Sequence, residues 1–300
     1  MDKIALLIIY NHRYDKNIEP LEQIYAGRFS YIYHIVPFYD GQKENVIPVY
    51  ESSFYFEGYI AQCFQHLKDK GFTHYFFVAD DLMLNPLITE QNLFEISGMK
   101  REQPFISELF SLKNKQYPWY HLIDALEYNP KKLGVEIADI IPSCNEVRSR
   151  IEYYNLNADV QIPLWMLIKL FWHRKTKRSF LFVLKSLLSF RWVQTMKYPL
   201  IGAYSDILLV PQSMMNRFVG YCGAFAASDL FVELAIPTAL IMCSEQVVTE
   251  KDLLLNKSLH SSKDDFSILD KYQFNYNALE SDFPENHLFL HPVKLSKWKK

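Results

Sequence analysis

Two adjacent carboxylates, Asp80 and Asp81, directly follow an apolar run at residues 74–79 that we expect to form a buried strand. Like charges held close together disfavour joint ionisation, and a bound divalent cation removes that penalty. Magnesium and manganese ions take carboxylate oxygens together with the phosphate oxygens of a substrate. The pair therefore predicts a seat for a metal–diphosphate, and the competing interpretation is a solvated turn that Asn85 and Pro86 help to form.

A second pair of carboxylates, Asp229 and Glu233, is spaced by one turn of a helix that we expect over residues 229–242. Either could be the general base that removes the proton of an attacking hydroxyl. Glu233 lies within the apolar run at residues 230–235, which is an unusual place for a surface acid. The alternatives are that Asp229 caps the helix and that Glu233 pairs with a surface lysine.

His291 stands in a loop before a proline, with Lys294 three residues further on. Imidazole is a suitable ligand for manganese and leaves other coordination positions open to phosphate oxygens. The alternative is an ordinary surface histidine near a basic tail. The spacing alone does not choose between these two interpretations.

The elements that must position these groups alternate through the first third of the chain. The apolar and β-branched runs predict strands, and helical spacing of apolar residues, ended by Gly71, predicts a helix over residues 55–70. This order predicts an α/β fold with a mainly parallel sheet flanked by helices. Ligands of such sheets bind at the carboxyl ends of the strands, where Tyr10, Asn11 and the Asp80–Asp81 pair would lie. The predicted strands are residues 4–10, 31–38, 46–50, 74–79 and 206–210.

Four sequence motifs together resemble GT-A glycosyltransferases. The run YFFVADDL at residues 75–82, followed by Asn-Pro, is similar to the DxD region of that superfamily. The Tyr10-Asn11 pair resembles the part that holds the nucleotide base. The runs GYCG at 220–223 and ASD at 227–229 are similar to the glycine loop and to the acidic motif that opens a helix. The run LHPVK at 290–294 resembles the carboxy-terminal histidine motif.

The resemblance implies a single Rossmann-like GT-A domain over residues 1–300, with a nucleotide-sugar-binding half at 1–98 and an acceptor-binding half at 99–300. It also implies a role for each matching residue. Asp81 and His291 would bind Mn²⁺ or Mg²⁺, and Asp229 would be the base or an acceptor contact. Ala79 stands where the family often has an acid that faces the ribose, which leaves the register open and lets Asp80 take over a contact. The implied donor-binding residues are Tyr10, Asn11, Asp80, Gly223 and Lys294.

A basic and aromatic segment, residues 161–200, interrupts this pattern. No acidic residue occurs between Asp159 and Asp206, and lysines and arginines alternate there with tryptophan, phenylalanine and leucine. This pattern is typical of amphipathic helices that lie in a membrane interface with their cations toward anionic headgroups. Charges interrupt every apolar window before it reaches about 18 residues, so we do not expect a spanning helix. The alternative is a buried helical hairpin with a solvated turn.

The composition narrows the function further. A net charge of −2 gives no reason to expect a nucleic acid as partner. The four cysteines are scattered and indicate reduced thiols in a cytoplasmic protein, and no signal peptide is recognised. Glycine-rich dinucleotide, P-loop and GxSxG motifs do not occur where they would be needed, which argues against dehydrogenases, P-loop enzymes and α/β-hydrolases.

The expectation from the sequence is a metal-dependent glycosyltransferase that takes a nucleotide-sugar donor such as a uridine diphosphate sugar. The acceptor would be a hydroxyl of a glycan or lipid-linked glycan in bacterial polysaccharide or lipopolysaccharide biosynthesis. We expect it to be cytoplasmic and peripheral to the inner face of the cell membrane. One rival is a nucleotidyltransferase acting on sugar phosphates, which would want a glycine-rich loop after the first strand. The other is a non-catalytic membrane-surface adaptor on a degenerate transferase fold.

Overall fold

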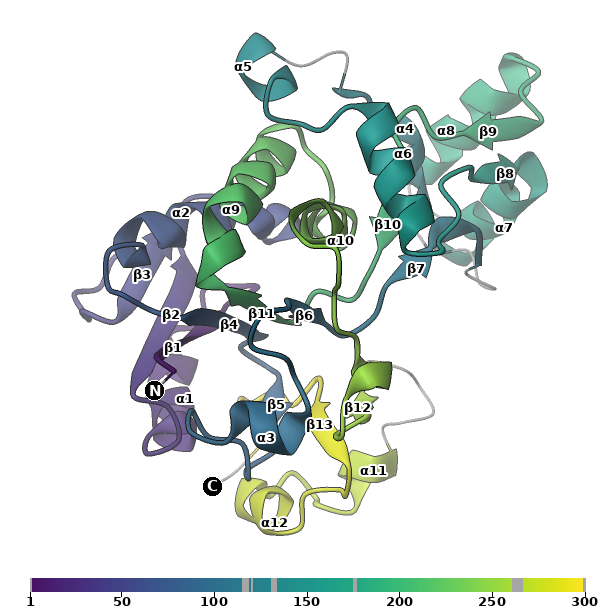
Figure 1. The fold of residues 1–300 in the computed structure, drawn as a ribbon. Helices are drawn as coiled ribbons and strands as arrows, with labels where there is room; N and C mark the ends of the chain where they lie inside the picture. Colours follow the sequence, from purple (N-terminus) through teal and green to yellow (C-terminus); the bar gives the residue numbers. More distant parts are fainter. Residues whose placement is uncertain are drawn as a thin grey trace.

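The computed structural model describes residues 2–114, 119, 121–130, 134–174, 177–260 and 267–298. Its centre is a six-stranded sheet with the order β3-β2-β1-β4-β11-β6 (Figure 1). The strands β1 to β4 are mutually parallel, whereas β11 runs antiparallel to both β4 and β6. The predicted α/β fold with a mostly parallel sheet is confirmed, and the reversed strand is an addition. The bounds are Ile4–Ile9 (β1), Tyr31–Pro37 (β2), Val46–Val49 (β3), His74–Ala79 (β4), Phe105–Ile106 (β6) and Ile207–Pro211 (β11).

The two central strands explain why the sheet is covered on both faces. Every residue of β1 and β4 is buried, which is typical of parallel strands between two helical layers. Their side chains alternate between two apolar clusters, with Leu7 and Phe77 in one and Leu6 and Phe76 in the other. The continuous apolar runs of the sequence therefore encode two cores rather than one.

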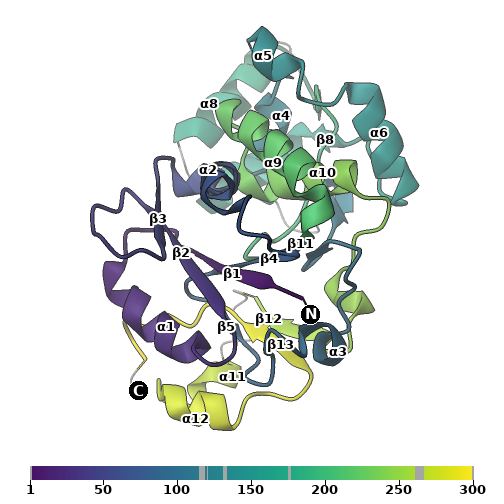
Figure 2. The same ribbon diagram turned by 60° about the vertical axis from the view of Figure 1, so that its left-hand side comes forward.

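Different helices cover the two faces (Figures 1 and 2). The helices α2 (Glu57–Leu67), α9 (Gln212–Ala227) and α10 (Val232–Cys243) pack on one face. The other face carries elements from both ends of the chain. These are α1 (Ile18–Tyr25), α3 (Leu93–Ser97), α11 (Ser267–Asp270), α12 (Tyr276–Ser281) and a small sheet of β5 (Met83–Leu84), β12 (Lys257–Leu259) and β13 (His287–Leu290).

The remaining elements lie beyond the layer of α9 and α10, away from the small sheet (Figures 1 and 2). The basic segment forms a helical hairpin of α7 (Leu164–Arg174) and α8 (Lys177–Leu188), framed by the strand pair β8 (Gln161–Pro163) and β9 (Val193–Thr195). The other elements of this region are β7 (Phe110–Ser111), α4 (Leu122–Glu127), α5 (Val135–Ala138), α6 (Cys144–Tyr153) and β10 (Ile201–Gly202). None of the helices described is long and apolar enough to cross a bilayer. Short 3₁₀ turns occupy Asp15–Asn17, Ser53–Tyr55, Leu112–Asn114 and Glu250–Asp252.

Two expectations about the region around residues 220–233 are wrong. The run GYCG does not form a glycine loop, because Gly220 and Gly223 lie inside α9. A Cβ built on Gly223 would lie 3.5 Å from the side chain of Ala61, so this position is a helix–helix contact. The predicted helix over 229–242 begins only at Val232, and Asp229 lies in the preceding turn with a left-handed φ of 57°. Asp229 and Glu233 therefore do not share a helical face.

Candidate functional site

Pairing between β5 and β13 brings the end of the chain to the Asp80–Asp81 pair. Phe289 lies opposite Leu84 and Leu290 opposite Met83 in antiparallel register. The backbone N–H of Val293 donates a hydrogen bond to the carbonyl oxygen of Asp81, with an N–O distance of 2.6 Å. The histidine that follows β13 is thereby fixed beside the acid that precedes β5.

Three side chains meet at this point. The Nε2 atom of His291 lies 3.1 Å from Oδ1 of Asp81, and its Nδ1 atom lies 3.8 Å from Oδ2 of Asp206. Asp206 precedes β11 and is held in place because its carbonyl oxygen accepts a hydrogen bond from the backbone of Ala79. The imidazole therefore stands between two carboxylates, one at each ring nitrogen.

Asp206 was not a candidate from the sequence, although it begins the strand that we expected over residues 206–210. The available signal was its position, because an acid at the start of a fully buried strand needs a partner. What the sequence did not reveal is that β11 runs antiparallel to β4. That direction places the start of β11 beside the end of β4.

The two neighbouring acids have opposite electrostatic settings. Burial, reinforced by the negative charge of Asp81, raises the pKa of Asp80 to about 7. Burial also acts to raise the pKa of Asp81, but the contact with His291 and the charge of Lys294 outweigh it and hold this pKa below its usual value. For His291, burial acts to lower the pKa, and the charges of Asp206, Asp81 and Asp80 raise it overall. The site thus favours an ionised Asp81 and discourages a second negative charge beside it.

The Asp81–His291 pair fits a divalent cation. Oδ1 of Asp81 and Nδ1 of His291 are buried atoms without a well-aligned hydrogen bond. In an octahedral site with bonds of about 2.1 Å, neighbouring ligand atoms lie about 3 Å apart, which is the separation of Oδ1 from Nε2. Asp206 lies 3.8 Å from the second ring nitrogen, on the side where a metal-binding histidine usually has a carboxylate, although this distance is too long for a hydrogen bond. In the part of the chain that is described, no cluster of three or more acidic, histidine or cysteine ligands occurs, so further ligands would come from phosphate and water.

Asp80 is held from the other side by the loop that follows β1. The side-chain amide of Asn17 donates to its carboxylate at 3.2 Å, and the backbone of Asn11 supplies a second hydrogen bond. Asp80 itself is 5% exposed. Asn11 and Asp80, both predicted to contact the donor, are therefore in contact with each other, and Asn17 joins them.

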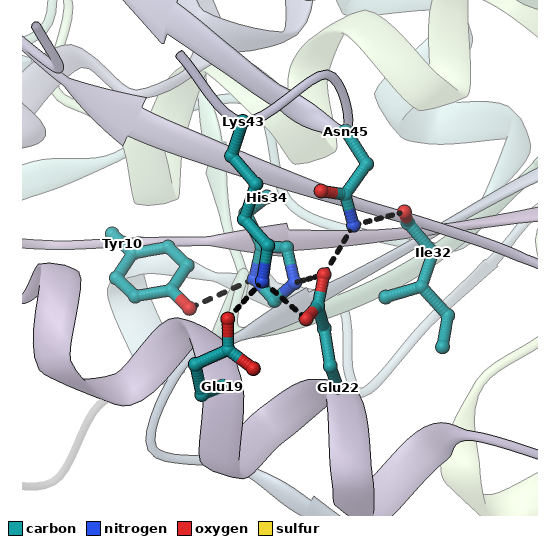
Figure 3. A network of polar contacts seen from close by, with 7 residues as sticks. All are labelled: Tyr10, Glu19, Glu22, Ile32, His34, Lys43 and Asn45. Atoms are coloured by element: carbon teal, nitrogen blue, oxygen red, sulfur yellow. Dashed lines mark hydrogen bonds and ion pairs between the residues drawn. The ribbon is translucent and has the colours of Figure 1, made fainter. Parts of the chain in front are cut away.

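Tyr10 serves a polar network beneath this loop (Figure 3). Its ring is fully buried, and its hydroxyl lies 2.8 Å from Nδ1 of His34. The other ring nitrogen of His34 lies 3.7 Å from Glu22, which also contacts Lys43. The Tyr10 ring has no exposed face for a nucleotide base. The predicted contact with the nucleotide base can therefore involve the backbone of Tyr10 and Asn11, but not the Tyr10 ring.

The other candidate residues lie on a different element. Ala226, at the end of α9, packs on Gly58 at the start of α2, so the turn after α9 is at the carboxyl edge of the parallel strands. Asp229 is exposed in this turn, and Glu233 is half-buried in the first turn of α10. The carbonyl oxygen of Glu233 accepts a hydrogen bond from Ala203, three residues before Asp206. The three residues from Ala203 to Asp206 span at most about 11 Å when extended, so the backbone of Glu233 is tied to a point close to Asp206.

No family model, curated protein or solved structure matches this chain. The geometry of the site is therefore the evidence on which a function can be argued.

The buried His34 predicts a measurable dependence of stability on pH. Burial lowers its pKa to about 4 in the folded protein, against about 6.5 in the unfolded chain. Its contribution is complete above about pH 6.5 and is lost as the pH falls to about 4, because only the unfolded state takes up the proton there. This loss amounts to about 3 kcal/mol at most. Urea unfolding from pH 7 to pH 4 should show a shallower decline in the His34→Gln variant than in the wild type.

The exposed His66 provides the matched control. The His66→Gln variant should follow the wild-type curve. Equal slopes for the wild type and His34→Gln would contradict the assignment of a neutral, buried His34.

Proposed function

We propose that this protein is a glycosyltransferase that uses a nucleotide-diphosphate sugar and a divalent metal ion. The supporting observation is the arrangement of Asp81, His291 and Asp206 at the carboxyl end of a parallel strand. A carboxylate and an imidazole whose facing atoms lie 3.1 Å apart, with no third acidic, histidine or cysteine ligand grouped with them among the described residues, suit an ion that is shared with a diphosphate. The lysine near this pair, Lys294, adds positive charge where a departing diphosphate would accumulate negative charge.

Each residue of this site has a separate task in the proposal. Asp81 and His291 hold the ion, and Asp206 orients the imidazole. The ion, when bound, neutralises charge on the leaving diphosphate. Asn11, in the loop after β1, contacts the nucleotide, while Asn17 holds the carboxylate of Asp80 through a hydrogen bond. Uridine diphosphate sugars are the donors that we would test first.

We assign the general base to Glu233 rather than to Asp229. Glu233 is half-buried, and its backbone is hydrogen-bonded to the segment that leads to Asp206. Asp229 is exposed and lies in a turn with left-handed backbone geometry. A base must stay in a defined place to remove the proton of the acceptor hydroxyl, and the helical position meets this requirement better.

The acceptor-binding part is proposed to dock on a membrane surface through the α7–α8 hairpin and β9. Among the side chains of this segment that the structure describes, ten large apolar ones are exposed, including Trp172 (66%), Phe190 (80%) and Trp192 (66%). Lys169 lies over the ring of Trp165, which is a pairing suited to a headgroup region. The side chains from His173 to Ser179 lie outside the described part, and they include four of the basic residues that motivated the prediction. The ten residues are Trp165, Trp172, Phe180, Leu181, Leu184, Leu187, Leu188, Phe190, Trp192 and Val193.

The metal assignment is tested by replacing Asp81 with asparagine. Uridine diphosphate with Mn²⁺ should raise the melting temperature of the wild type by about 5 °C at a ligand concentration about a hundredfold above Kd. The Asp81→Asn variant should lose this metal-dependent shift while it keeps a cooperative transition. The exposed Asp282 supplies the control variant, Asp282→Asn, which should retain the shift. A full shift in Asp81→Asn would refute the metal site.

The assignment of the base is tested by the kinetics of two isosteric variants. Glu233→Gln should lower kcat by about 10²–10⁴-fold without changing the donor-induced thermal shift, because it removes the proton-accepting carboxylate and keeps the shape of the side chain. Asp229→Asn should lower kcat by less than about tenfold. The rate of diphosphate release from the donor in the presence of a bacterial lipid extract measures both. A large loss in Asp229→Asn with little change in Glu233→Gln would exchange the two roles.

Membrane docking is tested by cosedimentation with vesicles. The wild type should bind vesicles that contain phosphatidylglycerol, and the double variant Trp172→Ser/Trp192→Ser should bind about tenfold more weakly or less, because it loses two interfacial anchors. The double variant Tyr50→Ser/Phe274→Ser removes two exposed rings elsewhere and should bind normally. Equal losses in both double variants would argue against a specific docking face.

A further inference from the structure

A cavity of about 760 Å³ opens between the end of α4, the second half of α8 and strand β9. Three of its lining residues are cationic, namely Lys185, Arg191 and Lys197, and one is acidic, Glu127. Hydroxyl and amide side chains of Ser186, Ser189, Gln194 and Thr195 complete its polar lining. We call this feature the headgroup cavity.

The charges of the headgroup cavity point to a phosphate ligand. Three cations from three positions of the chain converge on one concave space. Lysine and arginine side chains donate charge-assisted hydrogen bonds to phosphate oxygens. Lys185, Arg191 and Lys197 are all exposed, and Glu127 offsets one of their three charges, so the cavity keeps a positive excess that an anion can compensate. An anion with several oxygens therefore suits this cavity better than a neutral sugar.

The residues that line the headgroup cavity are neighboured in the chain by exposed apolar side chains, which we call the apolar rim. Leu184, Leu187 and Leu188 are exposed on α8, the same helix that contributes Lys185 to the lining. Phe190, Trp192 and Val193 are exposed on the segment that contributes Arg191. Apolar side chains this exposed next to a cationic cavity match a ligand that carries a phosphate on a hydrocarbon chain. A free anion would leave the rim unused.

The headgroup cavity also lies near the proposed base. Its lining residue Glu127 is followed by Tyr128, whose hydroxyl lies 2.9 Å from Oγ of Ser228 in the turn after α9. At the other end of α4, the ring of His121 stacks on Phe231 with 3.5 Å between ring centroids. The helix is six residues long, or about 9 Å. Helix α4 thus connects the cavity to the turn that leads to Glu233.

We propose that the headgroup cavity binds the phosphate or diphosphate of a membrane-embedded lipid, with the hydrocarbon chain lying along the apolar rim. The binding site stands on the cavity, its charges and its rim. That the bound lipid carries the sugar acceptor rests on the proposed function, and it follows from the short path along α4 to the candidate base.

The test compares two anionic lipids in phosphatidylcholine vesicles adjusted to the same measured surface potential. Phosphatidic acid presents a terminal phosphate, whereas the phosphate of phosphatidylglycerol is covered by glycerol. The wild type should bind the phosphatidic acid vesicles more tightly. The triple variant Lys185→Gln/Arg191→Gln/Lys197→Gln should lose this preference and bind them about tenfold more weakly or less.

The matched control is the triple variant Lys100→Gln/Lys251→Gln/Lys257→Gln, which removes three exposed lysines from outside the cavity. It should keep the preference. Equal losses in both triple variants, or equal binding of the two lipids by the wild type, would show that diffuse attraction to the membrane surface explains the binding. Either result would overturn the proposal. If the first triple variant melts at a lower temperature, Arg191→Gln and Lys197→Gln are compared singly, and an unchanged preference in both overturns the proposal.

Competition with soluble ligands distinguishes the source of the phosphate. Dihexanoyl phosphatidic acid should displace the protein from vesicles at a lower concentration than inorganic phosphate does. Equal potency of the two would show a free-phosphate site and overturn the lipid assignment. The thermal shift with uridine diphosphate and Mn²⁺ separates the two proposals. A lipid preference without a donor shift contradicts the proposed function alone, and a donor shift without a lipid preference contradicts the headgroup cavity alone.

Discussion

The structure is organised around two neighbouring carboxylates at the end of its central strand, a buried Asp80 and a half-buried Asp81. An ionised acid in such a place is costly unless hydrogen bonds or opposite charge compensate it. The loop after β1 supplies hydrogen bonds to Asp80, and the segment after β13 supplies His291 and Lys294 to Asp81. Both segments are therefore drawn to one edge of the sheet by the same electrostatic requirement.

The elements that carry strong local patterns were predictable from the sequence. The runs that became β1 and β4 are continuously apolar, and the spacing of apolar residues in α2 is helical. The direction of β11 was not predictable, because a strand buried on both faces has the same pattern in either orientation. The prediction of a glycine loop at the GYCG run was wrong for a related reason. Glycine marks a loop in many sequences, but Gly220 and Gly223 lie inside α9, where Gly223 faces α2.

The same distinction applies to the candidate site. Asp81 and His291 were recognisable because each stands at the end of an apolar run, and the structure brings them together. Asp206 and Asn17 were not, since their contacts depend on which strands are neighbours and on how the loop after β1 folds back. Tyr10 shows the converse. Its position after β1 suggested a surface contact, but its ring turns inward to His34.

The pairing of β5 with β13 has a consequence for biosynthesis. Residues 4–84 hold four parallel strands and the adjacent carboxylates Asp80 and Asp81, and a ribosome completes them early. The imidazole and the lysine beside them arrive only with residues 291 and 294. A nascent chain released before that point would hold the strands β1 to β4 but only one member of the Asp81–His291 pair. The contacts between Asp81 and His291 therefore form only after the segment that follows β13 has been synthesised.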